Sequence, residues 1–224
     1  LGWYDYVYGG PYIVPRIYFK HYQEYLKIAS SFNVKYYVAE YYPNWLEGPK
    51  GWIMSKLLWD PNQNLDHLLD DWYISAVGAR SAPYLRKFYE LWEDVWTNEI
   101  PKSSWWKRKG GTYLFFNNQS YVNDISYDRV LEADTLLNLA YKYANSKNHK
   151  NRIIDLLDMW EFSKMNYLYF RQKHNILRMN KGQKVVSSRK VTKKQIKSTI
   201  EKLDNHPLHN TIMHIYKKPN RVKY

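Results

Sequence analysis

Two segments favour β-strands, and they read Leu1-Gly2-Trp3-Tyr4-Asp5-Tyr6-Val7-Tyr8 and Val34-Lys35-Tyr36-Tyr37-Val38-Ala39-Glu40. Both are rich in the aromatic and β-branched residues that strands prefer. Gly9-Gly10-Pro11 ends the first segment, and the loop Tyr41-Tyr42-Pro43-Asn44-Trp45 follows the second. Each predicted strand therefore leads directly into a loop of turn-forming and aromatic residues.

The residues between the two segments predict a connecting helix. Residues 15–32 carry apolar side chains at helical spacing, and Asn33 is suited to a left-handed C-cap. A strand, a helix and a second strand form a βαβ unit, whose parallel strands end on the same side. Because Asp5 and Glu40 both lie near a strand end, we expect their carboxyl groups to lie in one cleft, as catalytic side chains do in (β/α)₈ barrels.

The remainder of the chain is predominantly helical by its pattern. Helices are predicted over residues 51–59, 65–77, 81–101, 126–144 and 150–174, and the last two form a hairpin. Residues 102–126 are expected to form an irregular loop with a short strand at 112–116, and a basic helix is expected over 192–203.

These patterns predict a helix-rich α/β fold, the C-terminal portion of a (β/α)₈ barrel followed by a helical appendage. We expect three parts: barrel units in residues 1–100, a loop and helical hairpin in 101–180, and a basic, partly helical tail in 181–224. Two strands are too few for a complete barrel, and the chain begins inside the first of them. We therefore expect it to be the C-terminal part of a larger protein.

The composition and the charge of the chain indicate which partners to expect. Hydrophobic residues at 45% are sufficient for a core, and aromatic residues at 18%, with 23 Tyr and 10 Trp, suit both a core and stacking on sugars. The net charge of +13 is concentrated in residues 180–224, whereas residues 1–100 are mildly acidic, so we do not expect nucleic acid as the partner.

Residue types and motifs that are missing from the sequence exclude several kinds of site. The chain contains no Cys, which excludes disulfides, thiolate zinc sites and a cysteine nucleophile. No apolar run approaches the roughly 20 residues of a transmembrane helix. We expect no cofactor and no metal, because the sequence contains neither a dinucleotide or P-loop motif nor a recognised His spacing.

Several motifs resemble a bacterial family of glycoside-hydrolase-like proteins, known as a domain of unknown function and related to the α-glucuronidase and β-hexosaminidase barrels. The shared motifs are Trp3-Tyr4-Asp5-Tyr6, Tyr36-Tyr37-Val38-Ala39-Glu40, Met54-Ser55-Lys56-Leu57-Leu58-Trp59-Asp60-Pro61 and Gly78-Ala79-Arg80-Ser81-Ala82-Pro83. The resemblance covers about residues 1–98. It implies a secreted or cell-surface location and a missing N-terminal barrel segment that carries the proton-donating carboxylate.

The resemblance implies a sugar site at the strand ends. Glycosidases use two carboxyl groups, so Asp5 and Glu40 are the predicted catalytic residues. An alternative is that either carboxylate only accepts a hydrogen bond from a Tyr hydroxyl or a loop amide. The predicted substrate-binding residues are those of the two adjoining loops, Tyr6, Tyr8, Tyr12, Tyr42, Asn44 and Trp45, together with Lys50, which would meet a uronate carboxylate.

The leading hypothesis is a carbohydrate-active protein, a glycoside hydrolase of a polysaccharide or glycan, of which the isolated chain is inactive. One alternative is a non-catalytic module that binds glycans through Trp45 and its neighbouring tyrosines. A second alternative is an interaction protein that binds anionic partners through the basic tail.

Overall fold

The computed structural model describes residues 1–7, 9, 12–41, 45–108 and 119–180, together with residues 194, 197, 198, 201, 202 and 205. Within these residues the protein has a helix-rich α/β fold with a small parallel sheet. The strands β1 (Gly2–Tyr6) and β2 (Tyr36–Glu40) are connected by the helix α1 (Phe19–Ser31). The predicted βαβ unit is thus confirmed.

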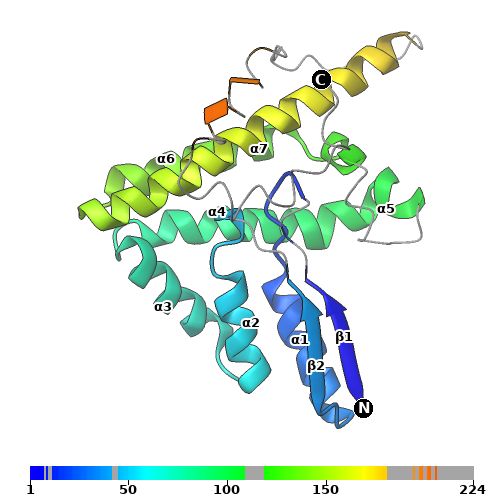
Figure 1. The fold of residues 1–224 in the computed structure, drawn as a ribbon, viewed down its shortest axis with the longest axis vertical. Helices are drawn as coiled ribbons and strands as arrows, with labels where there is room; N and C mark the ends of the chain where they lie inside the picture. Colours follow the sequence, from blue (N-terminus) through cyan, green and yellow to red (C-terminus); the bar gives the residue numbers. More distant parts are fainter. Residues whose placement is uncertain are drawn as a thin grey trace.

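All elements after β2 are helical in the part of the chain that the structure describes. They are η1 (Trp45–Glu47), α2 (Lys50–Trp59), α3 (Leu65–Val77), α4 (Ala82–Asp94), the short π-helix η2 (Val95–Glu99), η3 (Ile100–Lys102), α5 (Ser104–Arg108), η4 (Gln119–Asn123), α6 (Tyr127–Tyr143) and α7 (Lys147–Asn180). Helix α4 crosses the middle of the molecule, with the sheet, α1 and α2 on one side and the α6–α7 hairpin on the other (Figure 1).

Local sequence signals explain the ends of several elements. The Asn64 side chain accepts a hydrogen bond from the His67 N–H at 3.0 Å and caps α3, which ends at Gly78 with a φ of 84°. Ser126 caps α6 in the same way through the Arg129 N–H. Asn33, after α1, has a φ of 58°, which Asn tolerates better than most residues. These positions are the ones that the sequence indicates.

The structure differs from the prediction after residue 100. The expected irregular loop contains α5 and η4, and α7 is longer than the predicted helix over 150–174. The predicted strand at 112–116 and most of the basic helix over 192–203 lie outside the described residues. The division into three parts stays a prediction.

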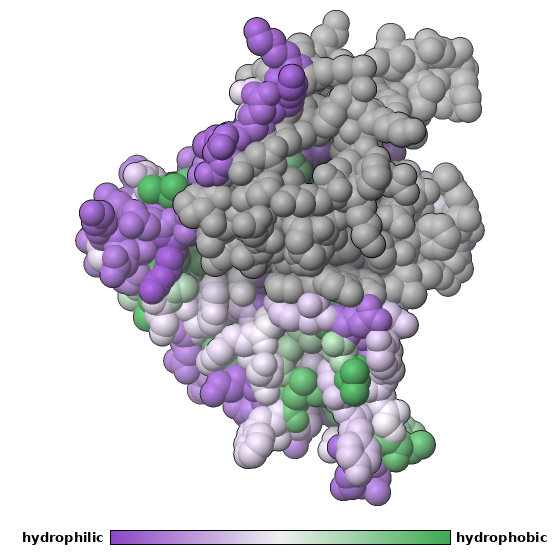
Figure 2. Space-filling view, viewed as in Figure 1, coloured by the Kyte–Doolittle hydropathy of each residue, from purple (hydrophilic) through white to green (hydrophobic). Residues whose placement is uncertain are grey.

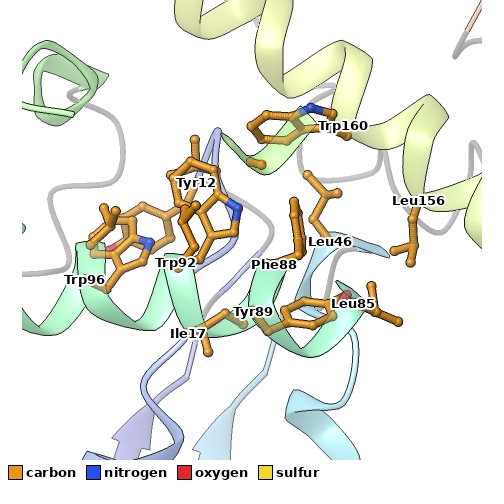
Figure 3. Packing of buried hydrophobic residues seen from close by; sticks show 14 of the residues in the cluster. Tyr12, Ile17, Leu46, Leu85, Phe88, Tyr89, Trp92, Trp96, Leu156 and Trp160 are labelled. Atoms are coloured by element: carbon orange, nitrogen blue, oxygen red, sulfur yellow. The ribbon is translucent and has the colours of Figure 1, made fainter. Parts of the chain in front are cut away.

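A continuous hydrophobic core holds the helical layers together, and it includes residues from both sides of residue 100. In its centre the α4 side chains Phe88 and Trp92 contact Trp160 of α7, with the Trp92 and Trp160 ring centroids 5.6 Å apart (Figure 3). All three side chains are essentially inaccessible to solvent. A large share of the aromatic residues therefore serves packing.

The sheet has two strands within the described residues, whereas a (β/α)₈ barrel has eight. An isolated two-stranded sheet is only marginally stable in water, so α1, which covers one face, is essential to it. Membership of a barrel stays a prediction. Among the described helices, none is long and apolar enough to span a bilayer.

Trp92→Ala should destabilise the protein by about 3–5 kcal/mol, because it removes a fully buried ring from the contact between α4 and α7. Chemical denaturation monitored by circular dichroism measures this loss. Trp59→Ala is the matched control, since the Trp59 side chain is 91% exposed. The control should change stability by no more than about 0.5 kcal/mol. Equal effects of the two variants would contradict the packing described for Trp92.

Candidate functional site

The register of the sheet separates Asp5 from Glu40. Asp5 is paired with Ala39, and Tyr6 is paired with Glu40. Paired residues of parallel strands point to the same face, and successive residues of one strand point to opposite faces. Asp5 and Glu40 therefore lie on opposite faces of the sheet. This corrects the expectation that the two carboxyl groups share one cleft.

Asp5 faces α1 and fixes the position of that helix. Its Oδ2 accepts hydrogen bonds from the Tyr25 hydroxyl of α1 at 2.6 Å and the Tyr37 hydroxyl of β2 at 2.8 Å. Its Oδ1 accepts the Tyr6 backbone N–H at 2.7 Å. Trp3, on the same face, stacks on Tyr25. Asp5 thus connects three elements of the βαβ unit, which matches the structural alternative considered for it.

The other face of the sheet carries Glu40 and is not covered by α1. The Tyr4 hydroxyl donates a hydrogen bond to Glu40 Oε1 at 2.5 Å, and the rings of Tyr4 and Tyr6 contact each other edge to face. The side chains of Tyr36 and Val38 are 74% and 58% exposed. We call these five residues, Tyr4, Tyr6, Tyr36, Val38 and Glu40, the open face. In the same part of the molecule, hydrophobic side chains reach the surface (Figure 2).

The open face brings together two of the predicted site residues, Glu40 and Tyr6, at the C-terminal ends of the strands. Tyr4 was not among the predicted residues. It precedes Tyr6 by two residues, however, and this spacing places both side chains on the same face of a strand. Tyr8, Tyr42 and Asn44 lie outside the described residues, and so does the side chain of Trp45. Their predicted roles stay predictions.

Tyr12 is in the core. Its side chain is 1% exposed, and its ring contacts those of Trp96 and Tyr121 edge to face. The Arg16 guanidinium lies over the Tyr12 ring at 5.3 Å from the centroid. The prediction that Tyr12 stacks on a sugar is corrected, because both the edges and the face of the ring are occupied by protein.

Lys50 is also buried. Its side chain is 2% exposed, and its Nζ lies 3.0 Å from Glu47 Oε1 and 4.9 Å from the centroid of the Tyr18 ring. We expected Lys50 to meet a substrate carboxylate, but the structure shows it paired with a carboxylate of its own chain. Burial lowers the pKa of Lys50 to about 8, while the nearby Glu47 carboxylate acts in the opposite direction.

Glu47 is a buried charged residue near the strand ends that the sequence did not single out. Its side chain is 1% exposed, and burial raises its pKa, against the lowering effect of the Lys50 ammonium. Its carboxyl group approaches the backbone of Gly9 so closely that a Cβ built on Gly9 would lie 1.8 Å from Glu47 Cδ. A glycine is required at this position by space. The loop after β1 and the loop after β2 therefore meet at Glu47.

One signal for this contact is present in the sequence. Glu47 and Lys50 flank Gly48-Pro49 at a spacing of three residues, inside a segment that is otherwise apolar. Gly48 has a φ of 49°, and a side chain there would overlap the Tyr89 hydroxyl. Opposite charges within an apolar segment that forms a tight turn are consistent with a buried ion pair.

A double-mutant cycle should show that Glu47 and Lys50 depend on each other. Glu47→Leu leaves the Lys50 ammonium buried without its partner, and Lys50→Met leaves the Glu47 carboxylate buried without the Lys50 ammonium. Each substitution should therefore cost about 3–5 kcal/mol of stability. The double variant should lose less than the sum of the single losses by more than about 1 kcal/mol. Denaturant titrations of the four proteins measure this, and additive losses would argue against the pair.

The effect of Lys50→Met should depend on pH. A raised carboxyl pKa means that the folded protein binds this proton more tightly than the unfolded chain does, so the penalty for burying Glu47 disappears as pH falls. Loss of the Lys50 ammonium strengthens that effect. We expect a smaller loss of stability at about pH 5 than at roughly pH 8. The double variant lacks both groups and is the control, because Glu47 cannot titrate in it. Equal losses of stability for Lys50→Met at both pH values would contradict the prediction.

Comparison with known proteins relates part of the chain to a known family. Residues 1–90 match the family model described as Domain of unknown function (DUF4838). No curated protein and no solved structure matched the chain. The matched segment contains the βαβ unit, the open face and the Glu47–Lys50 pair. The match supports a domain of unknown function over residues 1–90, the part of the chain that holds the candidate site.

Proposed function

We propose that this chain presents a glycan-binding surface, the open face, as part of a carbohydrate-active protein of the glycoside-hydrolase type. The observation that carries the proposal is the position of Glu40 at the C-terminal end of β2, on the face that α1 leaves uncovered. In barrels of parallel strands, side chains at this end form the active site. Glu40 is therefore the centre of the proposed site.

The chemistry of the open face suits a sugar. A carboxylate accepts hydrogen bonds from two neighbouring hydroxyl groups, and these charge-assisted bonds are stronger than neutral ones. The Tyr4 ring is 54% exposed, and its hydroxyl already holds Glu40 Oε1 in place. Tyrosine combines an apolar ring with a polar tip, as the alternating C–H and O–H groups of a pyranose require. Glu40 and Tyr4 supply both kinds of contact.

The barrel is the part of the proposal that explains the exposed strands. The strands of the βαβ unit are parallel, α1 covers one face, and Tyr36 and Val38 are exposed on the other. Parallel sheets are normally covered on both faces. We propose that further strands of the same protein pair with the edges of this sheet and complete a (β/α)₈-type barrel, whose packed interior would cover Tyr36 and Val38 and leave Glu40 at its C-terminal end.

Glycan binding without hydrolysis is the function that the described residues favour for the chain alone. Hydrolysis needs two carboxyl groups on either side of the scissile bond. Asp5, the expected second group, faces α1 and is held by Tyr25 and Tyr37. In a hydrolase, Glu40 would therefore act as nucleophile or base with an acid from another segment of the protein.

Glu40→Gln separates the two possibilities. In the protein that hydrolyses a glycan, this variant should abolish turnover and leave affinity within about tenfold, or about 1.4 kcal/mol, because the amide still forms hydrogen bonds but cannot act as base or nucleophile. If the protein only binds glycans, Glu40→Gln together with Tyr4→Phe should weaken affinity. A polysaccharide and oligosaccharide array, followed by calorimetry, provides both measurements.

Glu24→Gln is the matched control, because Glu24 is an exposed carboxylate of α1 and lies outside the open face. It should change neither turnover nor affinity. Unchanged binding and turnover in Glu40→Gln with Tyr4→Phe would exclude the open face as the glycan site.

A further inference from the structure

One end of the helical layers carries basic side chains without acidic neighbours in the sequence. Residues 135–154 and 72–89 contain no Asp or Glu. Five exposed cations of these segments lie where α3, α4, α6 and α7 meet, and we call this group the basic end. It consists of Arg80, Lys142, Lys147, Lys150 and Arg152. A strongly hydrophilic surface appears there on the left of Figure 2, over the turn between α6 and α7.

Several contacts bring the two acid-free segments together. Arg152 of α7 donates to the carbonyl oxygens of Ser75 and Ala76 at the end of α3. The Ser81 hydroxyl donates to the Ala140 carbonyl of α6 at 2.7 Å. His149 of α7 lies against Gly78, whose φ of 84° turns the chain from α3 toward α4. The turn with Arg80 is thus fixed beside the turn between α6 and α7.

Helix stabilisation accounts for only part of this charge. Cations favour the C-terminus of a helix, which explains Arg152 at the end of α3 and Lys142 in the last turn of α6. Lys147 and Lys150, however, lie in the first turns of α7, where the helix dipole disfavours positive charge. No ion pair of Arg80, Lys147 or Lys150 is formed with the described residues. The fold itself does not require these three cations.

We propose that the basic end binds an anionic polysaccharide, a chain with carboxylate or sulfate groups. The choice of a polysaccharide rests on the proposed function, whereas the anionic character of the ligand follows from the charges alone. Ammonium groups on flexible side chains attract a regularly charged polymer over a distance set by the ionic strength. The site would hold an acidic glycan on the molecule, away from Glu40.

The aromatic residues at the basic end disfavour single-stranded nucleic acid as the ligand. Binding of single strands depends on ring faces that are free for stacking on bases. Tyr84 and Tyr143 stack on each other with centroids 5.0 Å apart, and the Lys150 ammonium lies 5.8 Å from the centroid of the Tyr141 ring. One face of each ring is therefore engaged with a protein group. The basic end therefore offers mainly charge, which suits a polyanion that binds without stacking.

The test uses the full chain and fluorescently labelled polygalacturonate, with binding followed by anisotropy at low salt. The variant Lys142→Gln/Lys147→Gln/Lys150→Gln should bind at least about tenfold more weakly than the parent protein. The control Lys27→Gln/Lys35→Gln/Lys107→Gln removes the same charge from exposed lysines elsewhere and should bind within about twofold of the parent. The basic tail is the same in all three proteins, and thermal unfolding checks that both variants fold.

The outcomes separate this inference from the proposed function. Glu24→Gln, which alters an exposed carboxylate outside the open face, should leave polygalacturonate binding unchanged, and neutral dextran should not compete. Equal losses in the two triple variants, or none in either, would overturn the inference even if Glu40-dependent glycan binding is found. Tighter binding of duplex DNA that is lost in the basic-end variant would also overturn it and identify nucleic acid as the partner.

Discussion

The pairing of β1 with β2 decides what the candidate site can do. Because side chains alternate along a strand, the pairing of Asp5 with Ala39 sends Asp5 toward α1, and the pairing of Tyr6 with Glu40 sends Glu40 to the opposite face. A shift of one residue would exchange these roles. The hydrogen bonds of Asp5 with Tyr25 and Tyr37 oppose such a shift, since they are available only in the observed register.

The sequence predicted elements well wherever a local signal marks them. Asn64 and Gly78 delimit α3, Ser126 begins α6, and Asn33 ends α1, because capping and positive φ depend on a few adjacent residues. The region after residue 100 was predicted less well. No regular periodicity indicates α5 or η4, whose buried residues Trp105 and Tyr121 contact each other although they are distant in the sequence.

Site residues were harder to predict, because exposure depends on contacts between distant segments. Tyr12 follows a strand in a Gly/Pro-rich loop, yet Trp96 and Tyr121 enclose it from far along the chain. Lys50 was expected to face a ligand, but Glu47 binds it in the interior. The face of Asp5 follows from the register, which a pattern of aromatic residues on both faces of the strands does not specify.

The approach of Glu47 to Gly9 makes the loops after β1 and β2 a single mechanical unit. The carboxyl group fills the space that any side chain at position 9 would need, and Lys50 holds it there in a dry environment. Sequence change in one loop is consequently limited by the other. Insertions are therefore expected in the residues between each strand end and this contact rather than at Gly9 or Glu47.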